Sequence, residues 1–563
     1  MAMLYWEFFT LLSVLCKVSA ISVLQIRRSN AIYGQKAHTF TRSVRFYAYL
    51  CSAKKLNNMK KLVSLVAFMA CTLTALAGGL LTNTNQNAHF LRQMSQEGII
   101  DINGLYANPA GTAFLGDGFH LNLNYVITQQ SRDTRATFAP FKFGANNNGE
   151  ATKKFHGHAI APVVPSFMLS YNKSKWSLMA SFAVTGGGGK CEFDDGLGSF
   201  ESQAALLPLL GGAQGITAYS IDSYMKARSF YMGLTVGATY KLLPNLAASL
   251  GVRGIYATTH YEGYAKNILI NNPLAPGTMA SPAALYEACT TAGHPLAPTM
   301  AVLAQATQDI TMDCSQNGFG IAPIIGIDWK INDQWNFAAR YDFRTRLNLK
   351  NEATNSASSQ NVGALAQYQD GLKVRADMPA ILAAGLQYQP YSWMRMNLSA
   401  KGHFDKQAKA FADAQKLLKH GTWEVAAGEE FDICKHLTAS ISWQSTNYGT
   451  TDDYIKDSNI ICRSNSLGLG VRVKVAPRCS FDLGYMQTFY KAYDKQSDDY
   501  NNVSHTAAQV LTGIAMANGA DAATAAATAA TQVGALKSAG AFAGNEHFTR
   551  KNWVLGIGAN INF

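Results

Sequence analysis

The chain lacks the features that mark helical membrane proteins and nucleic-acid-binding proteins. Beyond residue 77 it contains no run of 18 apolar residues, so we expect no membrane-spanning helix there. Charged residues make up only 15% of the sequence. Residues 1–77 supply +9 of the formal net charge of +12, which leaves +3 for the rest. The basic excess therefore gives no reason to expect a nucleic-acid partner.

Cysteine and histidine patterns give no sign of a metal site, a cofactor site or a catalytic site. Six of the nine cysteines lie beyond residue 77, and none has the spacing of a metal ligand set. The serine, histidine and aspartate residues show no triad spacing. We therefore predict no enzyme activity, no metal and no cofactor. Cys289 and Cys314 share one long segment and are either a loop disulfide or two unrelated thiols.

The first 77 residues contain a secretory signal. Met59-Lys60-Lys61 is a positive n-region, residues 62–76 are apolar, and Ala75-Leu76-Ala77 is a small-residue cleavage site. The signal begins 58 residues into the chain, which favours a start codon assigned too far upstream; a genuine extension is the alternative. We expect residues 1–58 to be a non-native extension and residues 59–77 to be the signal peptide.

The last eleven residues alternate strictly between two kinds of side chain. Apolar residues occupy every odd position from 553 to 563, and small or mostly polar residues fill the even positions. Such a period of two places one face against an apolar medium and the other against water. The chain then ends on Phe563. A transmembrane β-barrel closes with a strand of this kind, which ends in an aromatic residue at the periplasmic interface.

Fourteen segments have the length and alternation of barrel strands. They cover residues 118–131, 157–171, 175–186, 224–241, 245–262, 317–331, 334–350, 371–389, 392–406, 417–433, 436–449, 459–475, 479–493 and 547–563. The links between them are alternately short and long, as in outer-membrane barrels with tight periplasmic turns and long outer loops. We predict an all-β, 14-stranded antiparallel transmembrane barrel over residues 118–563. It would lie in the outer membrane of a Gram-negative bacterium with both termini in the periplasm.

In the four segments that alternate most clearly, at 335–344, 394–401, 437–444 and 466–475, charge is confined to positions of one parity. Because an arginine facing lipid at the bilayer midplane costs about 2–4 kcal/mol, the charged parity should face the lumen. There the basic side chains could meet a ligand carboxylate, or pair with Asp342, Glu262 or carboxylates of the segment before the barrel. The basic residues in question are Arg253, Arg340, Arg344 and Lys401.

Residues 78–117 precede the first strand and do not alternate. Asn108-Pro109-Ala110 forms a compact corner, because proline disfavours helix at the residue before it. Such a segment could hang free or fold back into the lumen as a plug. Its position resembles that of the plug in the FadL-type transporters of long-chain fatty acids and aromatic hydrocarbons.

Further motifs similar to that family run along the chain. They are Pro162-x-x-Pro165, the turn at 172–175 with Trp176, the glycine run at 186–189, Asp377-Met378-Pro379, Gly385-x-x-Tyr388 and the terminal strand. The long loops at 263–316 and 494–546 depart from the family pattern. The resemblance implies a plugged, monomeric barrel without an open water pore, in contact with outer-membrane lipid.

The resemblance also implies a transport mechanism for a hydrophobic ligand. Outer loops would capture the ligand, the plug would rearrange, and the ligand would leave sideways into lipid at the kinked third strand. The implied kink residues are Gly186, Gly187, Gly188 and Gly189. The alternative is that these glycines form the flexible base of a loop. The implied ligand contacts in the plug are Gly78, Leu80, Leu81 and Phe90. Those in an outer loop are Phe200, Leu206, Leu207, Leu209 and Leu210. The alternative for these leucines is that they pack on neighbouring loops.

Two other functions fit a barrel with long loops. A small-solute porin would conduct ions steadily in a planar bilayer. A surface adhesin or antigen would use the loops, so that deletion of residues 494–546 would abolish surface binding and spare uptake.

Overall fold

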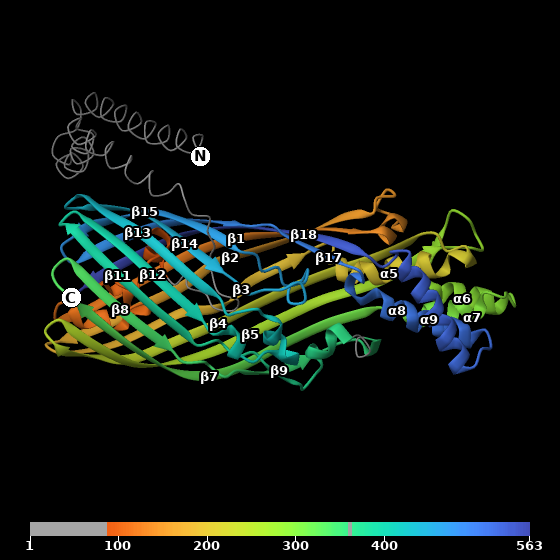
Figure 1. The fold of residues 1–563 in the computed structure, drawn as a ribbon, viewed down its shortest axis with the longest axis horizontal. Helices are drawn as coiled ribbons and strands as arrows, with labels where there is room; N and C mark the ends of the chain where they lie inside the picture. Colours follow the sequence, from red (N-terminus) through yellow and green to blue (C-terminus); the bar gives the residue numbers. More distant parts are fainter. Residues whose placement is uncertain (1–86, 359–362) are drawn as a thin grey trace, which may run out of the picture. The chain divides into compact units, whose positions relative to one another are not determined.

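The structure is a computed structural model, and it describes residues 87–358 and 363–563. The expected extension, the signal peptide and Gly78, Leu80 and Leu81 lie outside the described residues. The described chain forms one closed antiparallel sheet of 18 labelled strands (Figure 1). Four of these are short: β6 lies in a loop, and β9, β10 and β17 belong to interrupted wall strands. The barrel therefore has fourteen strands, as predicted.

The wall strands follow one another around the barrel in chain order. They are β1 (Gly118–Phe138), β2 (Thr152–Lys173), β3 (Trp176–Phe193), β4 (Tyr219–Leu243), β5 (Leu246–Asn271), β7 (Ile310–Lys330), β8 (Trp335–Asp342) with β9 (Asn348–Ala353), β10 (Lys373–Arg375) with β11 (Ile381–Tyr391), β12 (Met394–His403), β13 (Trp423–Cys434), β14 (Leu437–Asn447), β15 (Ser464–Ala476), β16 (Cys479–Tyr490) with β17 (Tyr493–Ser497), and β18 (Gly544–Asn562). The small β6 covers Met279–Ala280.

Strand β18 closes the barrel by pairing with both β16 and β1. Its ladder with β1 runs from His120 opposite Asn562 to Phe138 opposite Gly544. Closure matters because a sheet edge exposed to hydrocarbon would leave backbone amides without partners.

The side chains of β18 confirm the predicted parity. Leu555 and Ile557 are 40% and 49% exposed on the outer face, whereas Asn552 and Asn560 are buried in the lumen. Other strands also expose large apolar residues, such as Leu250. An apolar exterior around a polar interior is the reverse of a water-soluble protein and is typical of a transmembrane barrel. No helix in the described ranges is long and apolar enough to cross a membrane.

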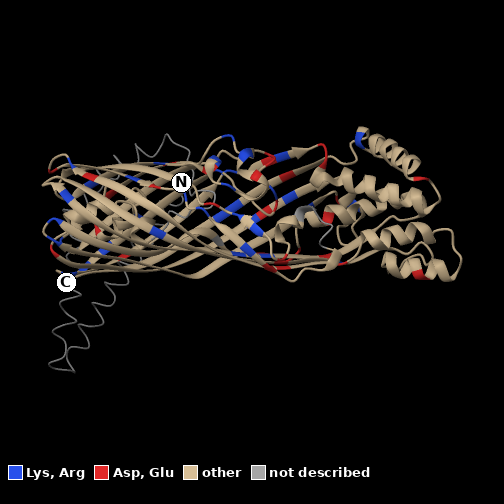
Figure 2. Ribbon diagram, turned by 90° about the horizontal axis from the view of Figure 1, so that it is seen from below, with Lys and Arg blue, Asp and Glu red and all other residues tan. Residues whose placement is uncertain are grey.

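The two ends of the barrel differ. Tight turns join the strands at the end that holds the C-terminus, which we call the turn end (Figure 1). The opposite end, the cap end, carries long loops with five helices: α5 (Gly198–Gly211), α6 (Pro282–Thr291), α7 (Ala297–Ala306), α8 (Val503–Ala517) and α9 (Ala522–Ser538). We call these helices the cap, and Figure 2 shows that they carry few charged residues.

Short 3-10 turns complete the loops. They are η3 (Ala139–Phe143), η4 (Gly212–Gln214), η6 (Gly363–Tyr368), η7 (Asp405–Gln407), η8 (Phe411–Leu417) and η9 (Tyr500–Asn502). Three predicted wall strands are wrong in their continuity. The segment expected at 334–350 breaks after Asp342 and resumes at Asn348, the one at 371–389 breaks after Arg375 and resumes at Ile381, and the one at 479–493 breaks after Tyr490 and resumes at Tyr493. Thr345 bridges to Met378 in the same register as Asp342 with Ile381 and Asn348 with Arg375, so the first two interrupted strands stay neighbours across their breaks. On the other side, the pairing with β7 shifts by one residue between Asp342 and Lys350, which is the mark of a β-bulge.

Residues 87–115 fill the lumen and form the plug. The plug contains α4 (Ala88–Arg92), η1 (Ile102–Tyr106) and η2 (Pro109–Phe114). Helix α4 packs against β15, β16 and β18, whereas η2 packs against β4, β5 and β7 on the opposite wall. The plug therefore crosses the barrel, and the first wall strand follows it at Gly118.

Candidate functional site

Buried ion pairs fix one side of the plug to the wall. The Arg92 guanidinium donates to Asp482 of β16 at 2.8 Å and to Glu430 of β13 at 2.7 Å. It also donates to the hydroxyl of Ser440 at 2.8 Å. A charge without a partner is costly to bury, so these acceptors hold α4 in one position against the wall.

Two further pairs extend this attachment along the plug. Glu97 lies 3.2 Å from the ammonium group of Lys401, and Asp101 lies 2.5 Å from the guanidinium of Arg472. Arg472 also contacts Asp482, the wall carboxylate that pairs with Arg92. Asp482 therefore links the ion pair of Arg92 to that of Asp101. The prediction that Lys401 pairs with a plug carboxylate is confirmed.

The Asn108-Pro109-Ala110 corner holds the opposite side of the plug. The Asn108 side chain accepts a hydrogen bond from the Gly111 amide at 3.0 Å, which caps η2. Its amide group donates to the Ile99 carbonyl at 3.2 Å and to the carboxylate of Asp328 on β7. Pro109 and Ala110 are buried. Asn108 therefore joins two parts of the plug to the wall through one side chain.

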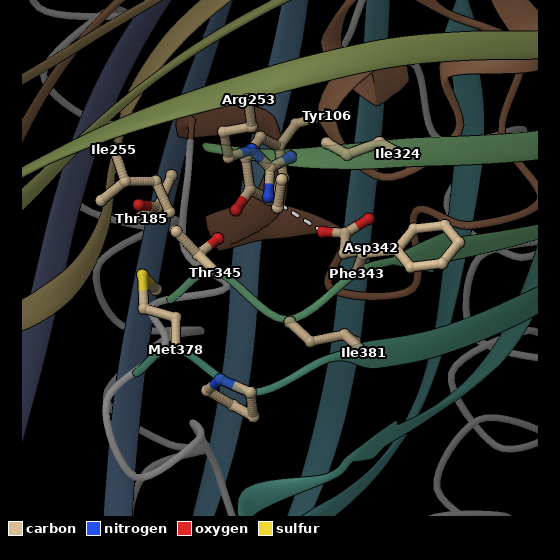
Figure 3. Close-up of a pocket in the computed structure, with 12 residues that line it drawn as sticks. Tyr106, Thr185, Arg253, Ile255, Ile324, Asp342, Phe343, Thr345, Met378 and Ile381 are labelled. Carbon is tan, nitrogen blue, oxygen red and sulfur yellow. Dashed lines mark hydrogen bonds and ion pairs between the residues drawn. The ribbon is translucent and has the colours of Figure 1, made fainter. Parts of the chain in front are cut away.

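A small cavity lies between the plug and the wall strands (Figure 3). Its volume of 20 Å³ has room for about one water molecule, so a hydrophobic ligand would enter only after side chains or the plug move. It is lined by Tyr106, Thr185, Arg253, Ile255, Ala322, Ile324, Asp342, Phe343, Thr345, Met378, Pro379 and Ile381.

The polar corner of this cavity is an ion-pair cluster. Arg253 and Arg340 contact Asp342 at 2.9 and 2.8 Å, which confirms the predicted wall pairing. The Arg253 guanidinium also lies 4.5 Å from the ring centroid of Tyr106 (Figure 3). Two cations thus face one carboxylate, and the cluster carries one positive charge in excess. The predicted alternative partner Glu262 contacts Lys226 instead.

Apolar clusters continue from the cavity toward the cap along β4, β5 and neighbouring strands. The first consists of Tyr231, Ile255, Ala257, Leu347, Leu349 and Met378. The second consists of Ala159, Cys191, Phe193, Leu197, Met225, Met312 and Leu365, with Phe200 packed against it. The sector formed by β12 to β16 instead carries the charged partners of the plug. The lumen therefore has a side lined by apolar clusters, interrupted at the cavity by the cluster of Arg253, Arg340 and Asp342, and a side that carries the ion pairs of the plug. We call them the apolar side and the charged side.

Strands β2 and β3 are not paired along their whole length. Their ladder runs to Phe167 opposite Phe182 and resumes only at Ile160 opposite Lys190. Residues 161–166 of β2 and 183–189 of β3 lie between these pairs. Pro162 and Pro165 fall in the unpaired part of β2, where each lacks the N–H that a ladder requires.

The glycine run lies in the unpaired part of β3. Gly187 and Gly189 have φ values of +94° and +70°, which side chains rarely tolerate. The register between β3 and β4 also shifts before and after Gly186. Thr185, directly before this run, lines the cavity. The cavity therefore borders the stretch of wall that lacks inter-strand pairing.

Solved structures share this architecture, although no protein-family model and no curated protein matches the sequence. A FadL homologue from Pseudomonas aeruginosa aligns with a TM-score of 0.52 and 14% identity, over 86% of this chain and 100% of that chain. The chain has the FadL fold. The toluene transporters TodX from P. putida and TbuX from Ralstonia pickettii align with TM-scores of 0.47 and 0.44 at 12% identity, each over 82% of this chain and 94% of its own.

Within this FadL fold, the predicted plug contact Phe90 lies in the lumen. It is buried with Leu91 and Met94, and the Lys401 ammonium lies 5.5 Å from its ring centroid. The outer-loop residues Leu206 and Leu207 are only 1% and 4% exposed and belong to the hydrophobic cores of the cap. In this conformation a ligand would reach them only after the cap opens.

Leu209 and Leu210 pack against the same cap cores as partly buried neighbours. Cys289 is buried in the cap and Cys314 in β7, and both are free thiols, so the possible loop disulfide is absent. Burial raises the pKa of the Cys289 thiol, because the thiolate would lose its hydration. No cluster of potential metal ligands occurs among the residues that the structure describes.

Sequence reasoning missed Arg92, Tyr106 and Thr185. The strand alternation assigned Lys401 and Arg253 to the lumen, but nothing local to the plug indicated which of its residues would meet them. Between positions 90 and 110 the charged residues are Arg92, Glu97 and Asp101. Charges this sparse in the plug segment were the signal in the sequence that could have pointed to its ion pairs with the wall.

Proposed function

We propose that the protein carries hydrophobic compounds, such as long-chain fatty acids or aromatic hydrocarbons, across the outer membrane of a Gram-negative bacterium. The observation that carries this proposal is the cavity between Tyr106 of the plug and Thr185, beside the unpaired stretch of β2 and β3. The FadL fold supports the same assignment. We place the turn end and both termini in the periplasm, the cap outside the cell, and the protein in the membrane as a monomer.

The proposed route begins at the cap. Opening of the cap would expose Leu206, Leu207 and Leu210 to a ligand arriving from outside. The ligand would then follow the apolar side of the lumen, which ends at the cavity. Each CH₂ group left in water costs about 0.8 kcal/mol, so a path along apolar side chains is favoured over a water-filled pore.

The proposed exit is lateral. A ligand in an enlarged cavity would pass between β2 and β3 at Gly186, Gly187, Gly188 and Gly189 and enter the lipid directly. The backbone there already lacks ladder hydrogen bonds, so opening it breaks none of the inter-strand bonds that seal the rest of the wall. The Asn108-Pro109-Ala110 corner would move with the ligand, because it packs beside the cavity wall at β7. Gly78, Leu80, Leu81 and Phe90 would form the ligand-contacting end of the plug.

The proposal is tested by uptake in cells that lack their own transporter for hydrophobic compounds. Cells that produce the full chain should take up labelled oleate or toluene faster than cells with an empty vector. The purified protein should show no steady conductance in a planar bilayer, because the plug fills the lumen. Equal uptake in both cell lines would overturn the proposal, and steady large conductance would favour a small-solute porin.

A further inference from the structure

A second, larger cavity lies at the turn end of the barrel. It occupies 520 Å³ between the plug residues Ile100, Asp101 and Ile102 and the ends of β15, β16 and β18. This volume falls within the range of about 300–1,000 Å³ that is common for small-molecule sites. The cavity lies on the far side of the plug from the route proposed above, so transport through the β2–β3 wall does not use it.

The lining of this cavity is strongly basic. Lys435, Arg472 and Lys474 contribute to it, together with His436. Within the described ranges, Asp101 is the one carboxylate among the lining residues, and Arg472 holds it at 2.5 Å. Lys435 and Lys474 are exposed, and no ion pair joins either of them to a carboxylate in the part of the chain that the structure describes. Two cationic groups are therefore available to a ligand.

The rest of the lining has an apolar wall beside four polar residues, His120, Ser480, Asn560 and Asn562. The plug contributes Ile100, Ile102 and Leu115, the end of β15 contributes Val475, and the turn after β15 contributes Pro477. A site that combines paired ammonium groups with an apolar wall suits a molecule with an anionic head and a hydrocarbon chain. Neither a simple anion nor a neutral hydrocarbon would use both parts.

We propose that this cavity binds a single-chain anionic amphiphile, with its head at Lys435 and Lys474 and its chain against Ile100 and Ile102. The ligand could be a long-chain carboxylate delivered by transport or a lysophospholipid from the membrane, since both offer the same chemistry. The carboxylate source rests on the proposed function, whereas the binding itself does not. Because Ile100 and Ile102 belong to the plug, an occupant contacts plug and wall together and favours the plug position described here.

Cys479 provides a direct probe, because its thiol lines the cavity and is partly exposed. The purified full chain in zwitterionic nanodiscs is alkylated with iodoacetamide, and the rate at each cysteine is read by peptide mass spectrometry. Cys434 has similar exposure but does not line the cavity, so it is the internal reference. Dodecanoate at about ten times its Kd should slow alkylation of Cys479 roughly tenfold and leave Cys434 unchanged.

The charge dependence is tested with Lys435→Gln and Lys474→Gln. Dodecanol, the neutral probe with the same chain, should protect Cys479 less than dodecanoate does. Each substitution should weaken the protection of Cys479 by dodecanoate roughly two- to fivefold and leave its protection by dodecanol unchanged. The matched control is Lys173→Gln with Lys175→Gln, two exposed lysines at another turn of the same end, which should change nothing. Lysophosphatidylglycerol is the second anionic probe, and stronger protection by it than by dodecanoate would assign the site to membrane lipid.

The outcomes separate this inference from the proposed function. Equal protection by dodecanol and dodecanoate, unaffected by the lysine substitutions, would overturn the anionic site. No protection of Cys479 at any ligand concentration would overturn it as well. Protection in a protein that fails to support uptake in cells would leave the site standing and contradict the transport function alone.

Discussion

Arg92 in the plug and Asp482 in β16 form an ion pair of 2.8 Å although both side chains are fully buried and 390 positions separate them. The pair lies on the charged side of the lumen, opposite the cavity and the unpaired stretch of β2 and β3. The plug thus has one side anchored by buried ion pairs. The other side is held by hydrogen bonds, from Asn108 to the wall and from Asn172, Asn336 and Arg340 of the wall to plug carbonyls. We expect rearrangement to begin at the Asn108 side.

Breaking the buried anchor should loosen the plug. Arg92→Met leaves Asp482 and Glu430 with their other partners, Arg472 and Arg395, so we expect a loss of about 3 kcal/mol, near the lower bound for a broken buried pair. Hydrogen exchange of residues 87–92 should rise and brief conductance openings should appear in planar bilayers. Lys416→Met, which removes the exposed pair with Asp413, is the control and should leave both readings unchanged. A plug as well protected as in the parent protein would contradict the anchoring role of Arg92.

Asn108→Ala should release the other side of the plug. The substitution removes the cap of η2 and the contacts with Ile99 and Asp328, and it leaves the Asp328 carboxylate buried with fewer donors. We expect a destabilisation of about 2–3 kcal/mol, because one lost hydrogen bond involves a charged group. Limited proteolysis should then cut the plug near η2 faster. Asn147→Ala, which removes side-chain hydrogen bonds in a cap loop, is the control. Equal cleavage of the plug in both variants would contradict the assignment.

Gly187 should be intolerant of a side chain. A Cβ there would lie 2.4 Å from the Ser229 carbonyl oxygen, and the backbone has a φ of +94°. We expect Gly187→Ala to cost about 1–2 kcal/mol in backbone strain, to shift β3 and to slow uptake. Gly212→Ala, at a loop position with no atom near the added Cβ, is the matched control. Thermal unfolding and oleate uptake measure the two effects, and unchanged uptake would argue against a role for this backbone.

The cap should loosen as the pH rises. Burial raises the pKa of Asp457 above its ordinary value of 3.8, although the Ser199 and Ser458 amides donate to it. A carboxyl group whose pKa is raised by folding contributes stability at low pH, and that stability is lost as the pH rises through the folded-state pKa. Hydrogen exchange of α5, corrected for intrinsic rates, should therefore increase with pH. Asp457→Asn should weaken this dependence without abolishing it, because burial and the nearby Asp457 also raise the pKa of Glu546, to about 7. An identical pH profile in the variant would contradict the role of Asp457.

The wall could be predicted from the sequence because lipid imposes a strict alternation on each strand. The positions of Leu555 and Asn552 followed from that alternation alone. The strands continue beyond their predicted ends at the cap end, and this could not be predicted. β5, for example, runs past the predicted end at 262 to Asn271, where apolar and polar residues no longer alternate clearly. The break after Asp342 was also hidden, since the alternation continues through it.

The plug contacts could not be predicted for a different reason. Arg92 and Asn108 meet residues of β7, β13 and β16 that lie hundreds of positions away, and no local pattern encodes such pairing. The resemblance to FadL-type transporters identified the Asn108 corner but not its acceptor Asp328. For Leu206 and Leu207, burial in the cap cores matches the alternative of loop packing, and contact with a ligand remains a prediction.

The most direct test of lateral release is a reversible crosslink between β2 and β3. A Cβ at Gly189 would lie 3.6 Å from that of Ala161, within the range of about 3.5–4.5 Å that a disulfide requires. The double substitution Ala161→Cys and Gly189→Cys should therefore oxidise to a bridge across the unpaired stretch. If ligand leaves through this stretch, uptake of oleate by the double variant should fall to the level of the empty vector on oxidation and recover on reduction. The single variants are the control: Gly189→Cys carries the same backbone strain at a φ of +70°, and its uptake should not change on oxidation. Full uptake with the crosslink complete would contradict the account.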